Sequence, residues 1–293
     1  MEPIRRVAFF GSPEFALPTL DALASSRFRP ILVVSQPPRP AGRGRHTEDT
    51  AVALRARSLG IEVWQPEKVK DPAFLDSFRA LDVDVAVVVA FGQIFPRALL
   101  ALPRLGCINL HGSLLPRHRG AAPIQAAIAA GDPETGVSTM RMEAGLDTGP
   151  ILLQRSTPIG DDEDAPALAV RLASIGAQLT VETLERLEQG ELVERRQDDM
   201  LATLAPRLDK RDALIDWTLD AATLSRRLRA FTPWPGLVSL CAGEPLKLHR
   251  ARPLEAPPDG AGDGAPPGSF LGLRGEQLSV GVVEFTAPPV LES

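Results

Sequence analysis

The chain has 293 residues, of which 44% are hydrophobic and 24% charged, and its formal net charge is −5. The length suits two domains of ordinary size, and the composition is typical of a globular protein with a sizeable core. No apolar run approaches the ~18 residues of a membrane-spanning helix. The apolar run Val7–Phe10 is too short for a secretory signal. Cys107 and Cys241 indicate neither a disulfide framework nor a metal site, so we expect a cytoplasmic protein without a metal. We also expect a monomer.

Short apolar runs alternate with amphipathic segments through the first half of the chain. Strands are expected at residues 4–12, 29–35, 61–64, 83–90 and 106–112, and helices at 13–26, 50–60, 72–81 and 121–130. Pro18 is the weak point of the first helix. The run 83–90 (VDVAVVVA) is almost wholly apolar, which is typical of a strand covered on both faces at the centre of a parallel sheet. The alternation predicts an α/β fold with a Rossmann-like, open, mostly parallel sheet.

The next segments complete this first domain, expected at residues 1–190. Residues 136–142 and 151–158 flank a Gly-rich turn and predict an antiparallel pair. Residues 165–190 predict a long helix, because apolar residues recur at helical spacing and Gly190 stands where a helix C-terminal glycine belongs. Residues 191–207 are polar with little periodicity, so we expect a linker.

Residues 208–293 differ from the first domain in their pattern of expected elements. We expect one helix at 220–230 and short strands at 236–243 and 246–252. A Pro/Gly-rich loop at 253–268 separates these strands from a hairpin at 269–285. One helix among short strands predicts a second, small β-barrel domain of OB-like type.

Common nucleotide-binding and hydrolase motifs are absent. The first strand is followed by GSPEFALP, which lacks the glycines of a dinucleotide-binding turn. Neither a phosphate-binding loop motif nor a nucleophile-elbow motif occurs. The sequence therefore gives no support to NAD, ATP or serine-hydrolase chemistry.

Polar side chains occur where the strand 106–112 ends. Asn109 and His111 are two apart, so they point to the same face of the strand at its carboxyl end. Asp147 follows later, in the glycine-flanked turn GLDTG. An amide, an imidazolium and a carboxylate suit attack on a carbonyl through an oxyanion, and no serine or cysteine lies in a nucleophile motif, which favours direct transfer. A structural histidine and an ordinary turn are the open alternatives.

The segment INLHGSLLPRHRGAAPIQAAIAAGDPETGVSTMRMEAGLDTGPIL resembles the folate-dependent formyltransferases. The Asn-x-His pair, the SLLP loop and the GLDTG turn carry this resemblance together. Three flanking segments, VAFFGSPEFALPTLDAL, SQPPRPAGRGR and LIDWTLDAATLSRRLRAFTPWPG, resemble the branch that acts on methionyl-tRNA. The resemblance covers about residues 4–250.

The resemblance implies transfer of a formyl group from 10-formyltetrahydrofolate to the α-amine of methionine on initiator tRNA. It implies that Asn109, His111 and Asp147 are catalytic. It also implies a folate-binding loop, and we expect the strand 83–90 to add to that pocket. The expected folate-binding residues are Ser113, Leu114, Leu115, Pro116, Val89, Ala90 and Phe91.

Two basic segments are expected to hold the tRNA although the chain is acidic. One is RPAGRGR, whose arginines suit phosphates and base edges. The other lies between Arg207 and Arg252, with nine Lys or Arg against five Asp or Glu. The expected tRNA-binding residues are Arg39, Arg43, Arg45, Arg207, Lys210, Arg226, Arg227 and Lys247.

Two other functions stay open at this point. One is a formyltransferase that acts on an amino sugar nucleotide or on glycinamide ribonucleotide. The other is a catalytically silent protein that binds tRNA or folate. The chain also ends sooner after its last expected strand than the family does, so we expect a shortened second domain with a weaker hold on tRNA.

Overall fold

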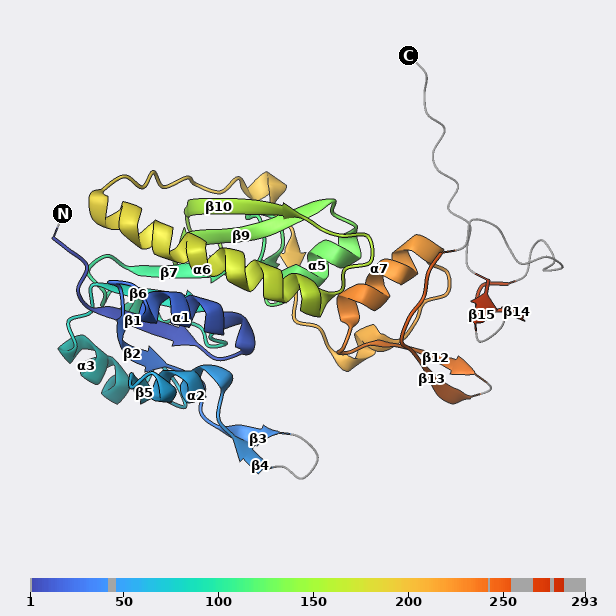
Figure 1. Cartoon of the computed structure of the whole chain (residues 1–293), viewed down its shortest axis with the longest axis horizontal. Coiled ribbons are helices and arrows are strands. Elements are labelled where there is room, and N and C mark those ends of the chain that lie inside the picture. Colours follow the sequence, from blue (N-terminus) through green and yellow to red (C-terminus); the bar gives the residue numbers. More distant parts are fainter. Residues whose placement is uncertain (1, 42–45, 242, 254–265, 275–276, 282–293) are drawn as a thin grey trace, which may run out of the picture.

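A computed structural model describes residues 2–41, 46–241, 243–253, 266–274 and 277–281. An open sheet of seven strands lies at its centre, in the order β10-β9-β7-β6-β1-β2-β5 (Figure 1). These strands are β1 (Val7–Gly11), β2 (Pro30–Val34), β5 (Glu62–Trp64), β6 (Val85–Val89), β7 (Cys107–His111), β9 (Glu134–Arg141) and β10 (Ile151–Pro158). The predicted Rossmann-like sheet is confirmed.

The sheet is parallel from β5 to β7 and antiparallel at β9 and β10. The all-apolar strand β6 is the fourth of the seven, and each of its residues is buried. Its central place is as predicted, because only a strand covered on both faces tolerates an unbroken apolar run. The chain leaves β1 toward β2 and later returns to β6 on the other side of β1. The strand order therefore reverses at this point, beside which ligands commonly bind.

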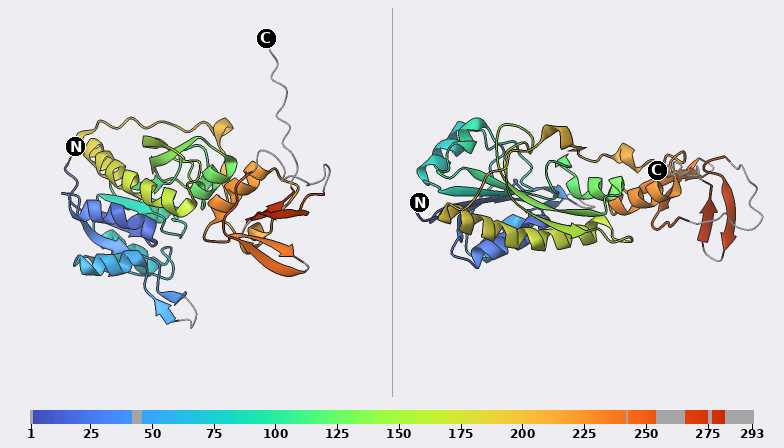
Figure 2. Two further views of the ribbon diagram at one scale, coloured as in Figure 1. Left: turned by 45° about the vertical axis from the view of Figure 1, so that its right-hand side comes forward. Right: turned by 90° about the horizontal axis from the view of Figure 1, so that it is seen from above.

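Helices cover both faces of the sheet (Figure 2). The first face carries α1 (Leu17–Ala24), α2 (Ala51–Ser58), α5 (Pro123–Ala130) and α6 (Ala165–Gln189). The other face carries α3 (Pro72–Ala80) and the short α4 (Arg97–Leu100), which the sequence did not predict. Alternate residues of each strand serve the two cores, so Phe9 packs on the first face and Phe10 on the other.

Helix boundaries follow local chemistry. The Thr50 side chain accepts a hydrogen bond from the Ala53 N–H and so caps α2. Gly190 ends α6 in the left-handed conformation, with φ of 75°. The first helix begins at Leu17 rather than at residue 13, after a 3₁₀ turn at Glu14–Ala16. Pro18 is tolerated there because the first helical turn needs no backbone N–H from it.

Two segments for which the sequence analysis expected no strand form short strands. A hairpin of β3 (Arg39–Ala41) and β4 (His46–Glu48) projects from the body (Figure 1). Within the expected linker, η2 (Asp199–Leu201) is followed by β11 (Leu204–Ala205), which pairs in parallel with β8 (Arg119–Gly120). The segment 191–207 therefore packs back on the N-terminal region instead of running free.

The C-terminal region begins with η3 (Lys210–Ala213) and α7 (Ala221–Phe231), and α7 lies against α5. It continues with the hairpins β12 (Leu237–Cys241) with β13 (Glu244–Leu248) and β14 (Phe270–Arg274) with β15 (Gln277–Val280). One helix with short strands matches the predicted composition of this region. In the part of the chain that the structure describes, these strands form two separate two-stranded sheets and do not close into a barrel.

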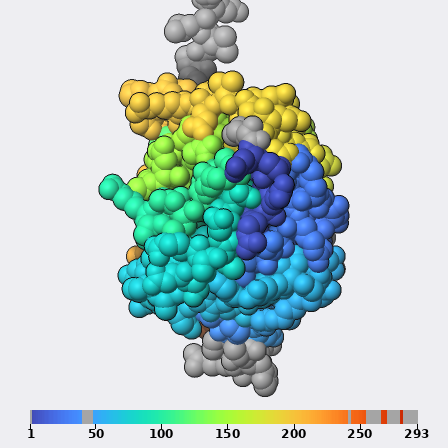
Figure 3. All heavy atoms as spheres, turned by 90° about the vertical axis from the view of Figure 1, so that its left-hand side faces the viewer, coloured from blue at the N-terminus to red at the C-terminus, as the bar shows by residue number. Residues whose placement is uncertain are grey.

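The N-terminal segment, dark blue in Figure 3, lies on the surface of the molecule beside the yellow segment that includes α6. The Ile4 N–H donates to Glu188 near the end of α6, and the N–H groups of Arg5 and Arg6 donate to Asp84 before β6. These contacts lie at the amino-terminal edge of the parallel strands. None of the described helices combines the length and the apolar character that crossing a bilayer requires.

Leu172→Ala is expected to lower the free energy of unfolding by about 2–5 kcal/mol, because it leaves a cavity in the core under α6. Leu172 has no exposed surface and belongs to the main core cluster. Urea unfolding measures the change. The matched control is Val170→Ala on the same helix, where the side chain is 74% exposed and the change should stay within about 0.5 kcal/mol. Equal losses in both variants would contradict the assigned packing.

Candidate active site

Asn109 and His111 lie at the carboxyl end of β7 and point to the same face of the sheet. Their neighbours on the strand, Ile108 and Leu110, pack in the main core on the opposite face. Asn109 is partly exposed, and among the residues that the structure describes its side-chain amide has no hydrogen-bond partner. An amide left free at this edge of the sheet is available to a ligand.

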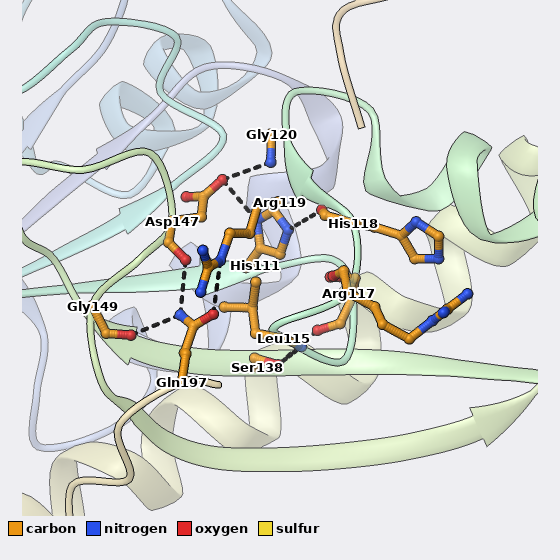
Figure 4. Close-up of polar contacts among 11 residues, drawn as sticks. His111, Leu115, Arg117, His118, Arg119, Gly120, Ser138, Asp147, Gly149 and Gln197 are labelled. Atoms are coloured by element: carbon orange, nitrogen blue, oxygen red, sulfur yellow. Dashed lines mark hydrogen bonds and ion pairs between the residues drawn. The ribbon is translucent and has the colours of Figure 1, made fainter. Parts of the chain in front are cut away.

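His111 is 5% exposed, and both nitrogens of its imidazole face protein oxygen atoms (Figure 4). Its Nε2 lies 2.9 Å from the backbone carbonyl oxygen of His118. Since a carbonyl oxygen only accepts, Nε2 carries the hydrogen. The other nitrogen, Nδ1, lies 3.7 Å from Oδ2 of Asp147. In the neutral ring Nδ1 therefore holds a lone pair that can accept a proton.

Asp147 reaches the imidazole from the turn between β9 and β10. Its backbone is left-handed, with φ of 52°, and its Oδ2 accepts a hydrogen bond of 2.9 Å from the Gly120 N–H. Glycines flank it because a side chain at Gly149 would overlap the Arg141 carbonyl oxygen, and one at Gly145 would overlap Thr148. The structure thus brings the predicted histidine and aspartate together.

Burial holds the pKa of the His111 imidazole below its usual value near 6.5, because a buried ring loses the hydration of its charged form. The Asp147 carboxylate and the His118 carbonyl act in the opposite direction, and the His118 ring adds to the lowering. His111 is therefore neutral at pH 7 in the free protein. The sequence analysis considered an imidazolium, whereas burial favours the neutral ring in the free protein.

Gln197 holds the Asp147 turn in place, and sequence analysis missed it (Figure 4). This residue belongs to the segment 191–207 and is 7% exposed. Its side-chain NH₂ donates to the carbonyl oxygens of Asp147 and Gly149, at 2.8 and 2.7 Å. Its Oε1 accepts from Arg119, which also pairs with Asp199. A glutamine in a polar stretch has no periodicity or motif that would have revealed this role.

A second polar cluster holds the His118 carbonyl that binds His111. The His118 ring is buried, and its Nε2 lies 2.6 Å from Asp132, which also pairs with Arg117. The His118 N–H donates to the Thr203 hydroxyl. His118 has a left-handed φ of 59°, a conformation that non-glycine residues rarely adopt. These contacts stabilise that conformation and so orient the carbonyl toward His111.

The expected folate-binding loop at Ser113–Pro116 is firmly anchored. The Ser113 hydroxyl donates to the Arg117 carbonyl, and the Leu115 N–H donates to the Ser138 hydroxyl. Leu115 is buried and packs with Met140 and Ile151, whereas Leu114 and Pro116 are partly exposed. Only Leu114 and Pro116 of this loop therefore offer apolar side-chain surface to a ligand.

The chain at the end of β6 contributes fewer side chains to the expected folate pocket than the sequence analysis predicted. Val89 is fully buried in the core on one face of the sheet, and Phe91 is buried on the other, against Phe10 and Phe95. Ala90 is exposed, with a left-handed φ of 48°. Val89 and Phe91 can thus contribute only backbone groups, because their side chains belong to the core.

The basic residues expected to bind tRNA fall into three groups. Arg39 is exposed on β3, whereas Arg43 and Arg45 lie outside the described residues. Arg207, Lys210 and Lys247 are exposed. Arg226 and Arg227 on α7 are partly buried: the first lies against Gly131 and donates to Thr223, and the second stacks over Phe231. Arg226 therefore packs against the N-terminal domain instead of forming part of an open basic patch.

The described residues contain no group of three His, Cys, Asp or Glu side chains able to hold a metal ion. Burial raises the pKa of the Cys107 thiol to about 12. A thiol with such a pKa is not a nucleophile near neutral pH. The site thus offers an amide donor, a neutral imidazole and a carboxylate around one position, which suits direct attack of an amine on a carbonyl carbon.

Comparison with known families agrees with this chemistry. Residues 5–184 match the family model "Formyl transferase", and residues 207–285 match "Formyl transferase, C-terminal domain". The chain belongs to the formyl transferase family, whose members are enzymes. The resemblance inferred from the Asn-x-His and GLDTG motifs is thereby confirmed.

Two of its relatives in that family are named methionyl-tRNA formyltransferase. The chain is 48% identical to the methionyl-tRNA formyltransferase of Citrifermentans bemidjiense, over 94% of this chain and 82% of that protein. It is 49% identical to that of Geobacter metallireducens, over 83% of this chain and 78% of that protein. The fold resembles an N-formyltransferase of Helicobacter canadensis solved with folinic acid and dTDP-3-aminofucose (TM-score 0.61, 18% identity, covering 78% of this chain and 80% of that one).

Gln197→Ala is expected to lower the rate of formyl transfer by about 10-fold or more, because the Asp147 turn loses two hydrogen bonds and the carboxylate is no longer aimed at His111. Gln197→Glu should behave alike, since a carboxylate cannot donate to carbonyl oxygens. Steady-state kinetics should show the loss in kcat, with little change in the KM of the formyl donor or in the KM of the amine acceptor. Glu191→Gln, an exposed change in the same segment, is the control. Full activity of Gln197→Glu would contradict the assigned role.

His111→Gln is expected to remove part of the protein's sensitivity to acid. In the wild type, the unfolded chain binds a proton near pH 6.5 that the folded site binds only at lower pH. The free energy of unfolding therefore falls as the pH is lowered through that range, and this contribution vanishes above about pH 7.5. Urea unfolding at about pH 7.5 and pH 5.5 measures the fall in both proteins. A fall of equal size in the variant would show that His111 is not its source.

Proposed function

We propose that this enzyme transfers the formyl group of 10-formyltetrahydrofolate to the α-amine of methionine on initiator tRNA, in the cytoplasm, for translation initiation. The observation that carries the proposal is the free Asn109 amide beside the contact between His111 and Asp147. The relatives that share nearly half of its residues over most of both chains are methionyl-tRNA formyltransferases. A folate as formyl donor is supported by the folinic acid in the related Helicobacter structure.

The donor fits the edge of the sheet beside these residues. Leu114 and Pro116 present apolar surface, which suits the flat face of a pterin. The backbone around Ala90 can pair with the polar ring edge, because a left-handed residue turns its peptide groups out of the strand direction. The formyl carbonyl would then lie within reach of the Asn109 amide.

The proposed reaction begins when the methionyl amine attacks the formyl carbon. Asn109 donates its amide N–H to the carbonyl oxygen as that oxygen becomes an anion. His111 takes the amine proton at Nδ1 and becomes an imidazolium, which the Asp147 carboxylate then stabilises. The proton passes to the folate nitrogen as its bond to the formyl carbon breaks. Formylated methionyl-tRNA and tetrahydrofolate are the products.

This order of reaction steps explains why a neutral histidine is useful as the proton acceptor. A ring that carried its proton beforehand could not accept one from the attacking amine. The low pKa imposed by burial keeps Nδ1 free, and the nearby carboxylate favours the charge once the proton arrives. His118 and Gln197 act on either side of this pair, one by orienting the imidazole and the other by orienting the Asp147 turn.

The deciding assay supplies 10-formyltetrahydrofolate with either methionyl-tRNA, an amino sugar nucleotide or glycinamide ribonucleotide. Formyl transfer to methionyl-tRNA alone is expected. Asn109→Ala, His111→Ala and Asp147→Ala should each lower kcat by about 10²–10³, with circular dichroism showing an intact fold. Transfer to a small amine instead of the tRNA would contradict the proposed acceptor. Near-normal kcat in the variants would contradict the proposed roles.

A further inference from the structure

A row of three polar side chains crosses the sheet from the proposed catalytic histidine to the edge strand. His111 on β7 lies directly opposite Ser138 on β9, and Ser138 lies directly opposite Gln154 on β10. Residues that face each other across antiparallel strands carry their side chains on the same side of the sheet. All three side chains therefore point to the side of the sheet on which the loop Ser113–Pro116 lies.

The Ser138 hydroxyl uses its whole hydrogen-bonding capacity on this row and on the loop. Ser138 has no exposed surface, and its hydroxyl donates to the Ser113 carbonyl at 2.6 Å. The hydroxyl oxygen accepts from the Leu115 N–H at 3.0 Å (Figure 4) and from the side-chain NH₂ of Gln154 at 2.9 Å. A hydroxyl has one donor and two acceptor positions, so Ser138 has none left for another partner.

The Gln154 amide is held in one orientation. Its NH₂ group donates to the Leu115 carbonyl at 2.9 Å as well as to Ser138, and its Oε1 accepts from Arg195 in the segment 191–207. A flipped amide would place its oxygen against the Leu115 carbonyl oxygen and its NH₂ against the Arg195 guanidinium, and neither pair can form a hydrogen bond. Arg195 thereby directs both N–H donors of Gln154 toward the loop.

Leu115 is the point at which these two side chains hold the loop. Its N–H is bound by Ser138 and its carbonyl by Gln154, and its side chain is buried. A residue that is fixed at both backbone groups and by its side chain has little freedom to move. Since Leu114 and Pro116 adjoin it, these bonds also fix the two apolar side chains that the proposed function assigns to the face of the pterin.

We propose that Ser138 and Gln154 are positioning residues for the formyl donor, which they serve by keeping the loop Ser113–Pro116 in its binding conformation. The inference rests on the proposed function, because that function assigns the loop to the folate. Ser138 is buried, and Gln154 gives both of its N–H donors to protein atoms. Both residues therefore act through the loop and not by touching the donor.

Loss of these anchors should change the affinity for the donor and not the rate of the chemical step. A loop without them spends part of its time in other conformations, and the apparent donor affinity falls with the fraction of molecules that stay competent. A bound donor selects the competent loop, so the reaction at saturating donor keeps nearly its wild-type rate. This is the opposite of the result expected for Gln197→Ala.

The test combines calorimetric binding of folinic acid to the full-length chain with steady-state formyl transfer to methionyl-tRNA. Gln154→Met keeps the length of the side chain and removes its donors, and Ser138→Ala removes the hydroxyl. Gln154 is partly exposed, so Gln154→Met decides the question if Ser138→Ala does not fold. The control is Arg155→Met on the same strand, because the exposed Arg155 side chain pairs with Glu182 of α6 on the other face of the sheet.

Gln154→Met and Ser138→Ala should each bind folinic acid about 5–10-fold more weakly, as expected for the loss of one or two hydrogen bonds. The KM of the formyl donor should rise by the same factor, while kcat and the KM of methionyl-tRNA stay within about 2-fold. Arg155→Met should match the wild type in all of these constants. Wild-type affinity for folinic acid in Gln154→Met would overturn the proposal. A fall in kcat without weaker donor binding would also overturn it, because that result would place the two residues at the reacting groups.

Failure of this proposal differs from failure of the proposed function. Binding of folinic acid requires neither tRNA nor formyl transfer. The proposed function fails if the wild type leaves methionyl-tRNA unformylated, whatever the variants do. The proposal for Ser138 and Gln154 fails if the wild type binds folinic acid and the variants bind it equally well.

Discussion

The His111 imidazole and the Asp147 carboxylate approach within 3.7 Å in a site almost closed to water. Burial alone would lower the pKa of the His111 imidazole, and a carboxylate surrounded by water would raise that pKa only slightly. Their combination yields a ring that is neutral at rest and gains a stabilised charge when a proton arrives. The neighbouring residues fix the position of either His111 or Asp147.

Segments far apart along the chain supply that support. The Asp147 turn is held by Gly120 from one loop and by Gln197 from the segment that leads to the second domain. The same segment supplies Thr203, which binds the backbone of His118. The segment 191–207 is therefore part of the proposed active site.

The carboxyl ends of the parallel strands gather polar and charged groups at one edge of the sheet. The residues proposed to act on the formyl carbon lie on β7 and on the turn that follows β9, and the loops after β2, β5 and β6 line a hollow at the same edge. Since parallel strands all end at the same edge, a long substrate can contact both places without any change in the fold. An acidic chain can thus hold an anionic partner, because the positive charges are gathered locally.

Much of this protein could be predicted from its sequence, because local chemistry decides it. The unbroken apolar run of β6 required burial on both faces, and Gly190 provided the left-handed end of α6. Asn109, His111 and Asp147 were identified by spacing and by resemblance, and their roles stay a prediction. Only the tertiary structure could reveal Gln197 and the burial of His111. A glutamine in a polar stretch acquires its role from partners dozens of residues away, and a pKa depends on surroundings that exist only once those segments have packed together.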